Sequence, residues 1–428
     1  MATNRTFQAM INDFLPNDLF KEELIKRDYV LSNVEKDDTW IGASSATGNG
    51  GNLIVPFKAA GASSIAMGSL SASNDIAEDL YVRGVITTQK EAWGSMIFNH
   101  RDLMEHEQVS EKNFLKILPD AINDFMDYMR NVVSVNLLNG AWFAKLTADA
   151  TSSSGVITVD RPDRFVVGQK VIVQDINGLN VTGYVAPTGG IDMNQGLITL
   201  VTQRNGSTPV NFSITSITVA NQGKCYNDGA NVTGQAFSSL RQLLLSSANG
   251  GDATIYGVTK VNYPYTQAIN IPGASVTATN LVEKLFDGYT QTRLFGKGAP
   301  TDILMSYKNF STVLKIVEAS KGAYNVVPDS KKASQYGWTE IMIGSVTSQP
   351  LKFVGIQEMD DDIIIYLDWR ALKFYSNGFF RKRKSPDGIE YFEVRATTGF
   401  QYIVDVCLFG ELVLQRPSYC GIMFGISY

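Results

Sequence analysis

Hydrophobic residues recur every three or four positions from Ser110 to the pair Asn139 and Gly140. This spacing places them on one face of an α-helix, and Asn-Gly is a typical helix stop. Pro119 lies inside the pattern, which predicts either a short lead-in helix with a kink or a principal helix with Pro119 in its first turn. From Pro119 onward the helix would be about 30 Å long, enough to form the spine of a domain.

The pattern changes after this helix. Between Gly155 and Ala220, short runs of β-branched and aromatic residues alternate with turn sequences such as Asn177-Gly178 and Asn205-Gly206. This alternation is typical of short strands joined by tight turns. The strand-like runs begin at residues 156, 170, 181, 197 and 210. We therefore predict a small β module inserted into a larger fold.

Helical and strand patterns mix again from Ala236 onward, which predicts an α+β domain from which the β module is an excursion. Helices are predicted in the segments that begin at residues 236, 279 and 308. Strands are predicted in the segments that begin at 302, 340, 351 and 362, and in the tail from Glu390.

Two segments before the long helix lack an evident core of their own. The first forty residues carry two short amphipathic patterns on either side of Pro16, and short helices are marginal unless their apolar side chains find a partner. Residues 80–98 are rich in strand-forming residues, with turns expected at 88–90 and at Gly94. Residues 80–98 are therefore predicted to form a long extended hairpin, which would be unstable unless it packed on another surface. We expect the arm to pack on a neighbouring chain.

The length and composition indicate several folded modules. A chain of 428 residues and 46.9 kDa exceeds what one core usually organises, so we expect two or three modules. With 44% hydrophobic residues, disorder is excluded. Charged residues make up only 18%, below the average of about 25%, so much of the outer surface should be uncharged. The net charge of -5 argues against binding nucleic acid over the whole surface, although a local basic patch is compatible with it.

The sequence offers little material for catalysis or metal binding. The three cysteines, Cys225, Cys407 and Cys420, are far apart and are predicted to be buried free thiols. The two histidines, His100 and His106, form no zinc-binding pattern and are expected at the surface. We therefore predict no catalytic residues, no metal and no enzyme activity.

Two further motifs have ordinary interpretations. The glycine-rich stretch 48–51 matches neither a phosphate-binding loop nor a dinucleotide-binding loop, so we predict a flexible loop and no cofactor. The run 360–362 is acidic, but successive strand residues point to opposite faces, so we predict a polar turn. No segment has the pattern of a secretion signal or a membrane span, and we expect a chain made in the cytosol that has no membrane partner.

The order of these features carries a family resemblance. An N-terminal arm precedes a GGNLIVPF segment that opens an extended loop ending near Leu103, and the long helix and the β insertion follow. Further along come GGDATIYGV, an Asn-Tyr-Pro-Tyr segment at 262–265, and a tail from Val394 that contains Arg416-Pro417-Ser418. In this order the chain resembles a tailed-bacteriophage major capsid protein of the Hong Kong 97 type.

The resemblance implies an α+β capsid fold with an N-terminal arm, an extended β-hairpin loop, a long spine helix, peripheral and axial domains, and an additional small β module. It divides the chain as follows: 1–50, N-terminal arm; 51–106, extended loop; 107–150, spine helix and part of the peripheral domain; 151–222, inserted β module; 223–358, axial domain; 359–428, peripheral and axial strands with the C-terminal segment.

The resemblance also implies a function and partners. Copies of the chain would form hexamers and pentamers that close into an icosahedral shell around double-stranded DNA, in a virion assembled in the host bacterial cytoplasm. A portal protein and a decoration or cement protein would be further partners. Because the arm is too short to be a fused scaffolding domain, we expect a separately encoded scaffolding protein.

Particular residues are expected to contact the next subunit or the genome. Candidates for inter-subunit contact are Phe7, Phe14 and Phe20 in the arm and Arg83, Lys90 and Trp93 in the extended loop. The strongest basic cluster, Arg381, Lys382, Arg383 and Lys384, is a candidate for weak non-specific contact with packaged DNA. Its alternative is a solvated cluster, or one paired with acids such as 360–362 of a neighbour.

Two other functions are compatible with the same sequence. A β-rich phage tail or adhesin-type binding protein would use the module at 155–220 for recognition. An encapsulin-like compartment would share the capsid fold, although the inserted β module is not expected there.

Overall fold

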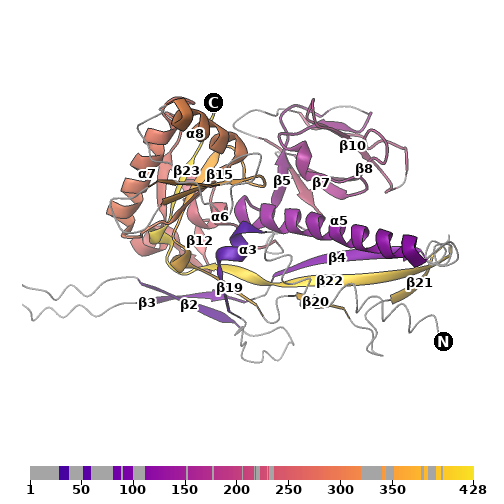
Figure 1. Cartoon of the computed structure of the whole chain (residues 1–428), viewed down its shortest axis with the longest axis horizontal. Helices are drawn as coiled ribbons and strands as arrows, with labels where there is room; N and C mark the ends of the chain where they lie inside the picture. The colour runs from indigo at the N-terminus through magenta and orange to yellow at the C-terminus, as the bar shows by residue number, and fades with distance from the viewer. Residues whose placement is uncertain are drawn as a thin grey trace, which may run out of the picture. The chain divides into compact units, whose positions relative to one another are not determined.

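The computed structural model describes the chain in separate stretches (Figure 1). These are residues 28–37, 52–58, 81–87, 90–99, 111–150, 153–175, 178–204, 206–215, 217, 222–228, 230, 236–319, 340–343, 351–376, 380–383, 392–396 and 399–428. The chain forms two compact units: Met1–Ser32, Lys90–Phe237 and Ser376–Gly410 make the first, and Asn33–Gln89, Ser238–Tyr375 and Glu411–Tyr428 make the second.

The spine of the first unit is helix α5, Glu111–Leu138. It confirms the long helix that the spacing of apolar residues predicts. Pro119 lies within this single helix, so neither a separate lead-in helix nor a first-turn position is found. The helix begins one residue after Ser110 and ends at Leu138, in agreement with the predicted start and the predicted Asn-Gly stop, so only the interpretation of Pro119 is wrong.

Strand β4, Lys90–Asn99, belongs to the first unit and is paired differently from the sequence prediction. It runs without interruption through Gly94 and pairs antiparallel with the long strand β22, Gly399–Leu414, from Asn99 opposite Gln401 to Lys90 opposite Gly410. Strands β3, Tyr81–Ile86, and β4 confirm the strands predicted within 80–98, but the turn at Gly94 and the pairing of these strands as one hairpin are wrong. Strands β20, Phe380–Lys382, and β21, Phe392–Ala396, pair with β22 as well.

Gly94 has a packing role instead of a turn role. A Cβ atom at this position would overlap the ring of Phe125 on α5, whose Cε2 atom would be 2.9 Å away. Glycine inside a strand often marks such a close approach. The glycine therefore lets β4 lie directly against the spine helix.

The predicted β module is present in the first unit and is larger than expected. Its sheet has the order β5-β11-β7-β8-β10-β6, with β9 paired to β10. The strands are β5 Trp142–Lys145, β6 Val156–Thr158, β7 Lys170–Gln174, β8 Asn180–Val185, β9 Ile191–Asp192, β10 Leu197–Val201 and β11 Lys224–Asn227. The described residues of the run that begins at 210 lie in no strand, and Ile214 makes an isolated bridge to Ala150.

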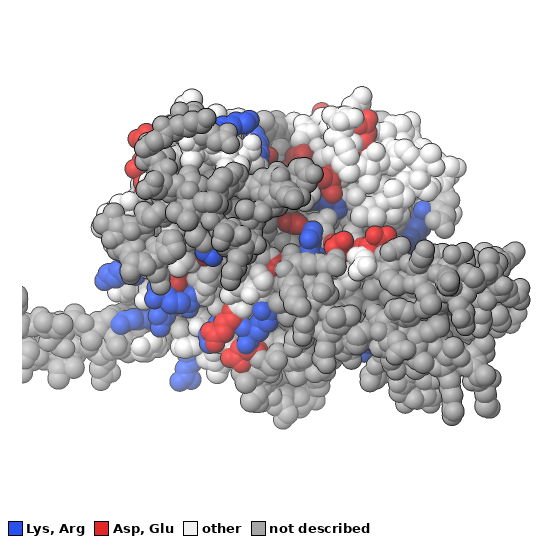
Figure 2. Space-filling model, viewed as in Figure 1, with Lys and Arg blue, Asp and Glu red and all other residues white. Residues whose placement is uncertain are grey.

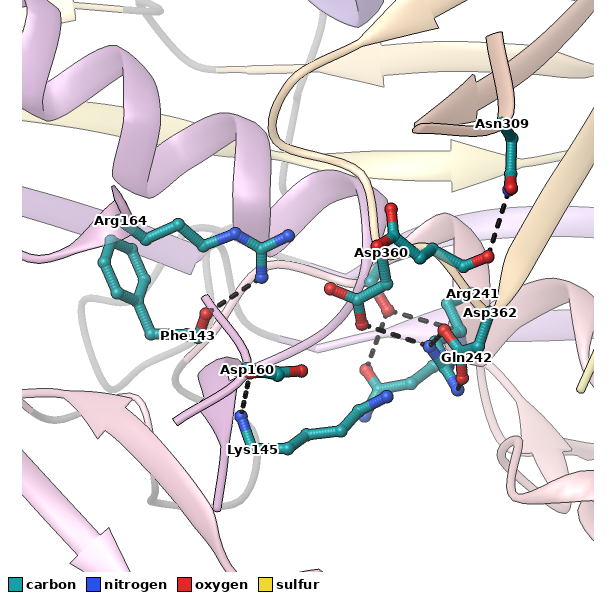
Figure 3. A network of polar contacts seen from close by, with 11 residues as sticks. Phe143, Lys145, Asp160, Arg164, Arg241, Gln242, Asn309, Asp360 and Asp362 are labelled. Atoms are coloured by element: carbon teal, nitrogen blue, oxygen red, sulfur yellow. Dashed lines mark hydrogen bonds and ion pairs between the residues drawn. The ribbon is translucent and has the colours of Figure 1, made fainter. Parts of the chain in front are cut away.

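The β module and the spine helix share one apolar core. Val135 of α5 is buried with Phe143, Leu200 and other side chains of the module. The side chain of Arg164 is also buried and donates to the carbonyl of Phe143, as Figure 3 shows. The face of the module at the upper right of Figure 2 carries mainly uncharged side chains, in keeping with the low charge of the sequence.

The second unit is built on a mixed sheet with the order β14-β23-β18-β15-β17-β16. The strands are β14 Ile269–Pro272, β15 Asp302–Ser306, β16 Glu340–Ile343, β17 Leu351–Ile356, β18 Ile363–Leu367 and β23 Gly421–Phe424. Helices α7, Leu281–Gly296, and α8, Tyr307–Ala319, pack against it and share its apolar core. These helices and strands confirm the predicted α+β composition.

Smaller elements complete the description. They are α3 Tyr29–Asn33, α6 Leu240–Leu244, β1 Glu35–Asp37, β2 Leu53–Lys58, β3 Tyr81–Ile86, β12 Thr254–Ile255, β13 Val258–Thr259 and β19 Leu372–Tyr375. Single 3-10 turns are η2 Pro162–Arg164, η3 Ser247–Asn249, η4 Lys260–Asn262, η5 Pro264–Thr266, η6 Trp369–Ala371 and η7 Pro417–Tyr419. Helix α6 is much shorter than the helix predicted from residue 236.

The ammonium group of Lys260 caps the C-terminal end of α6. Its Nζ atom donates to the carbonyl oxygens of Gln242 and Leu245, both at 2.9 Å, and thereby satisfies carbonyl groups left open at the end of the helix. The side chain is buried, and this desolvation lowers the pKa of Lys260 from 10.5 to about 8, against the opposing charge of Asp252.

Lys260 should give the second unit a distinctive pH dependence. Between pH 8 and pH 10.5 the unfolded chain keeps the lysine proton and the folded chain releases it, so the free energy of unfolding rises with pH. Across this pH window, the free energy of unfolding of the parent chain should rise by up to about 3 kcal/mol relative to that of the variant Lys260→Met. Urea unfolding of the unassembled chain, followed by circular dichroism, measures the difference. Parallel pH profiles of the two proteins would contradict the assignment.

Candidate assembly surfaces

The hairpin formed by β2 and β3 has two different faces. The strands pair antiparallel from Leu53 opposite Ile86 to Lys58 opposite Tyr81. Because side chains alternate along a strand, one face carries the opposed pairs Ile54 with Val85, Pro56 with Arg83, and Lys58 with Tyr81. We call these six residues the outer face of the hairpin.

The outer face is exposed and largely apolar. Ile54 is 55% exposed, Tyr81 56% and Val85 40%. Arg83, which the sequence singles out, lies among them and is exposed too. Three large apolar side chains on one small face are typical of a protein-binding surface. Arg83 was predicted from the sequence and its apolar neighbours were not, although the alternation in Leu53–Lys58 could have revealed Ile54.

The opposite face of the hairpin is buried within the second unit. Val55, Phe57 and Ile86 are buried, and the ring of Phe57 stacks on that of Tyr256 with 6.0 Å between centroids and an interplanar angle of 11°. Gly84 permits this contact, because a Cβ atom there would lie 2.8 Å from Cε2 of Phe57. The hairpin is therefore fixed on one side and open on the other.

Lys90 and Trp93 lie on β4 in the first unit, and Arg83 lies on β3 in the second. The predicted extended loop, 51–106, thus contributes to both units. Trp93 is 55% exposed, its Nε1 donates to Glu91 at 2.8 Å, and its ring meets Phe409 edge to face at 6.0 Å. It also lines a cavity of about 620 Å³ together with Phe125 of α5. Contact of these residues with another subunit stays a prediction.

The residues of the predicted basic cluster differ in their exposure to solvent. Lys382 is buried, whereas Arg383 is exposed. The guanidinium of Arg383 lies 3.4 Å from the carboxylate of Asp405 and 4.8 Å from the centre of the Phe392 ring. The side chains of Arg381 and Lys384 lie outside the described part of the chain. At least one cation of the cluster is therefore paired within its own chain.

The acidic run 360–362 serves structure in the second unit. Figure 3 shows Arg241 with Asp360 and Asp362 around it; its Nη1 lies 3.1 Å from Asp360 and its Nη2 lies 2.7 Å from Asp362. Asn309 donates to the carbonyl of Asp361. Asp360 and Asp362 thus pair with Arg241 of the same chain, while pairing of this run with a neighbour's basic cluster stays a prediction.

The remaining candidate residues fall into two groups. Cys225, Cys407 and Cys420 are buried free thiols as predicted, and burial raises the pKa of each. Outside the described residues lie Phe7, Phe14, Phe20, His100, His106 and the glycine-rich stretch 48–51.

The described residues also show two general properties. No group of three or more His, Cys, Asp or Glu side chains among them is arranged to hold a metal ion. None of the helices in this part of the chain has the length and hydrophobicity of a membrane span.

Comparison with known proteins gives structural matches only. No protein family model and no curated protein sequence matches the chain. The matching solved structures include the capsid of cyanophage A-1(L), with 11% identity, 88% of each chain covered and a TM-score of 0.43. The capsid of the native GTA particle has 8% identity, covers 93% of this chain and 90% of its own, and gives 0.45. The capsid of Myoviridae phage XM1 has 8% identity, covers 93% and 91%, and gives 0.38. All three of these structures are capsids, two of them from phages.

Proposed function

We propose that this chain is the major capsid protein of a tailed bacteriophage, and that copies of it assemble into the icosahedral shell that encloses the double-stranded DNA genome. The observation that carries the proposal is the β2–β3 hairpin, which is fixed on its inner side and exposes Ile54, Tyr81 and Val85 on its outer face. A second copy of the chain is the partner that a self-assembling shell supplies for such a surface.

The energetics of a hairpin support this proposal. An isolated two-stranded hairpin is at best marginally stable in water, and among the described residues β2 and β3 form a sheet of two strands. Covering the outer face with another chain would remove apolar surface from water and stabilise both partners. Obligate interfaces of this kind bury about 2,000–5,000 Å² in total, so several such surfaces per subunit are expected.

The order of elements supports the same function. The arm, extended strands, spine helix and β insertion follow each other along the sequence as in the Hong Kong 97-type capsid proteins that it resembles. In this proposal the first unit, with α5 and the part of β22 up to Gly410, is the peripheral domain, and the second unit is the axial domain near the centre of hexamers and pentamers. The protein has a structural role and catalyses no reaction.

The proposal extends to partners and location. Assembly would take place in the host bacterial cytoplasm with a separately encoded scaffolding protein, a portal protein and, on the outside, a decoration or cement protein. Contact with packaged DNA would be weak and non-specific, through cations of the 381–384 cluster other than the buried Lys382.

Electron microscopy of the purified chain, combined with sedimentation velocity, tests the proposed function. We expect shells, tubes or free capsomers, with a population that grows as the protein concentration is raised. Monomers or trimers at all concentrations, with or without co-expressed scaffolding protein, would contradict the proposal and would favour a β-rich binding protein.

A further inference from the structure

Tyr256 occupies a backbone conformation that its side chain does not favour. It is the first residue of the two-residue turn between β12 and β13, where Ile255 pairs with Val258, and its φ angle is +49°. Gly257 follows with a φ angle of +83°. Two positive φ angles define the hairpin turn that prefers Asn-Gly, and an aromatic residue in the left-handed region costs roughly 1–2 kcal/mol. Some interaction of the tyrosine must offset this cost.

Three sets of contacts converge on this residue. Its carbonyl oxygen accepts from the backbone N–H of Val85 on β3 at 2.8 Å. Its ring stacks on Phe57 of β2. Its hydroxyl donates to the carbonyl of Leu412 at 3.2 Å and accepts from the N–H of Leu414 at 2.8 Å. Tyr256 thus joins both strands of the hairpin to β22 within the second unit.

The hydroxyl fills a specific gap in the β22 ladder. The N–H of Gln415 donates to Ala371, so odd-numbered residues of β22 face β19 in this region. The backbone N–H and carbonyl groups of Leu412 and Leu414 therefore point to the other edge of β22, because the direction of the backbone hydrogen bonds alternates from residue to residue along an antiparallel strand. On that edge β4 pairs with β22 only as far as Gly410. The hydroxyl of Tyr256 takes the place of a neighbouring strand for one carbonyl and one N–H group.

We propose that Tyr256 is a positioning residue for the β2–β3 hairpin. The two hydrogen bonds of its hydroxyl lock the hairpin to β22 and so fix the direction in which the outer face is presented to the next subunit. The expected effect on assembly rests on the proposed function. The two hydrogen bonds that form the lock lie within a single chain. Gly84 is part of the same arrangement, because a Cβ atom there would lie 3.1 Å from Cβ of Tyr256.

The variant Tyr256→Phe tests the lock, since it keeps the ring and removes only the hydroxyl. Two backbone groups then lose their partner, and the hairpin amides of β2 and β3 should exchange with deuterium about tenfold faster in the unassembled chain. Amides of α7 and α8 should be unchanged. Tyr375→Phe is the matched control, because it removes a hydroxyl that accepts from Gln415 on the same sheet without touching the hairpin.

Assembly provides the second readout. Particles of Tyr256→Phe should lose their uniform diameter in electron micrographs, and those of Tyr375→Phe should keep it. Phe57→Leu, which weakens the stacking and leaves the hydroxyl, should produce the same faster hairpin exchange. Unchanged hairpin exchange in Tyr256→Phe would overturn the lock, whatever the result for Phe57→Leu. Faster exchange with particles of normal, uniform diameter would overturn its role in positioning, and a parent chain that forms no particles would instead contradict the proposed function.

Discussion

Ile54→Asp should abolish particle formation while leaving the subunit folded. Ile54 is on the outer face of the hairpin, opposite Val85, and is exposed in the single chain, so the change costs little there. In a closed contact with a second copy the new carboxylate would be buried without a partner, which costs several kcal/mol per contact. Every subunit of a shell repeats that cost. Sedimentation velocity should show free subunits, and circular dichroism should match the parent.

Met193→Asp is the matched control for this prediction. Met193 is 56% exposed, close to the value for Ile54, but it lies in the β module of the first unit. The same charge is therefore introduced at an equally exposed apolar position away from the hairpin. Particles of normal yield from Ile54→Asp, or equal losses from both variants, would show that the outer face has no special part in assembly.

Gly94→Ala should destabilise the first unit by about 1–3 kcal/mol, because the added methyl group overlaps the ring of Phe125 where β4 lies against α5. Amides of α5 and β4 should exchange faster with deuterium, whereas those of α7 in the second unit serve as the internal reference. Sheet pairing between β4 and β22 should loosen as well, and assembly yield should fall.

A second-site change separates this clash from other effects of the alanine. Phe125→Leu shortens the side chain that the new methyl group meets, so the double variant Gly94→Ala with Phe125→Leu should lose less stability than the sum of the two single changes. Strict additivity of the two effects, or a Gly94→Ala protein as stable as the parent, would contradict the close-approach role of Gly94.

Local patterns predicted most helices and strands but not their partners. The spacing of apolar residues located α5, and β-branched runs located β7, β8, β15 and β18. In contrast, β4 finds its partner some 310 residues away, where Ser95 donates to Asp405. Nothing in the sequence around Gly94 distinguishes a turn from a glycine that permits a strand to touch a helix.

The exposed outer face of the hairpin was predicted only in part, for a similar reason. Arg83 and Trp93 stand out by residue type, but exposure of Ile54 and Val85 depends on which face of the hairpin meets Tyr256. A strand shows its alternation in the sequence, but the sequence does not say which face is covered. The turn at Tyr256 and Gly257 gave no signal at all, because tyrosine is an unfavourable residue for it.

Hydroxyl-radical footprinting can determine whether a second copy of this chain covers the outer face of the β2–β3 hairpin. Radical modification of Tyr81, Val85 and Ile54 would be compared between unassembled protein and purified particles by mass spectrometry. We expect these exposed side chains to be modified readily in the free subunit and to be strongly protected in particles. Equal modification of all three in both states would contradict it.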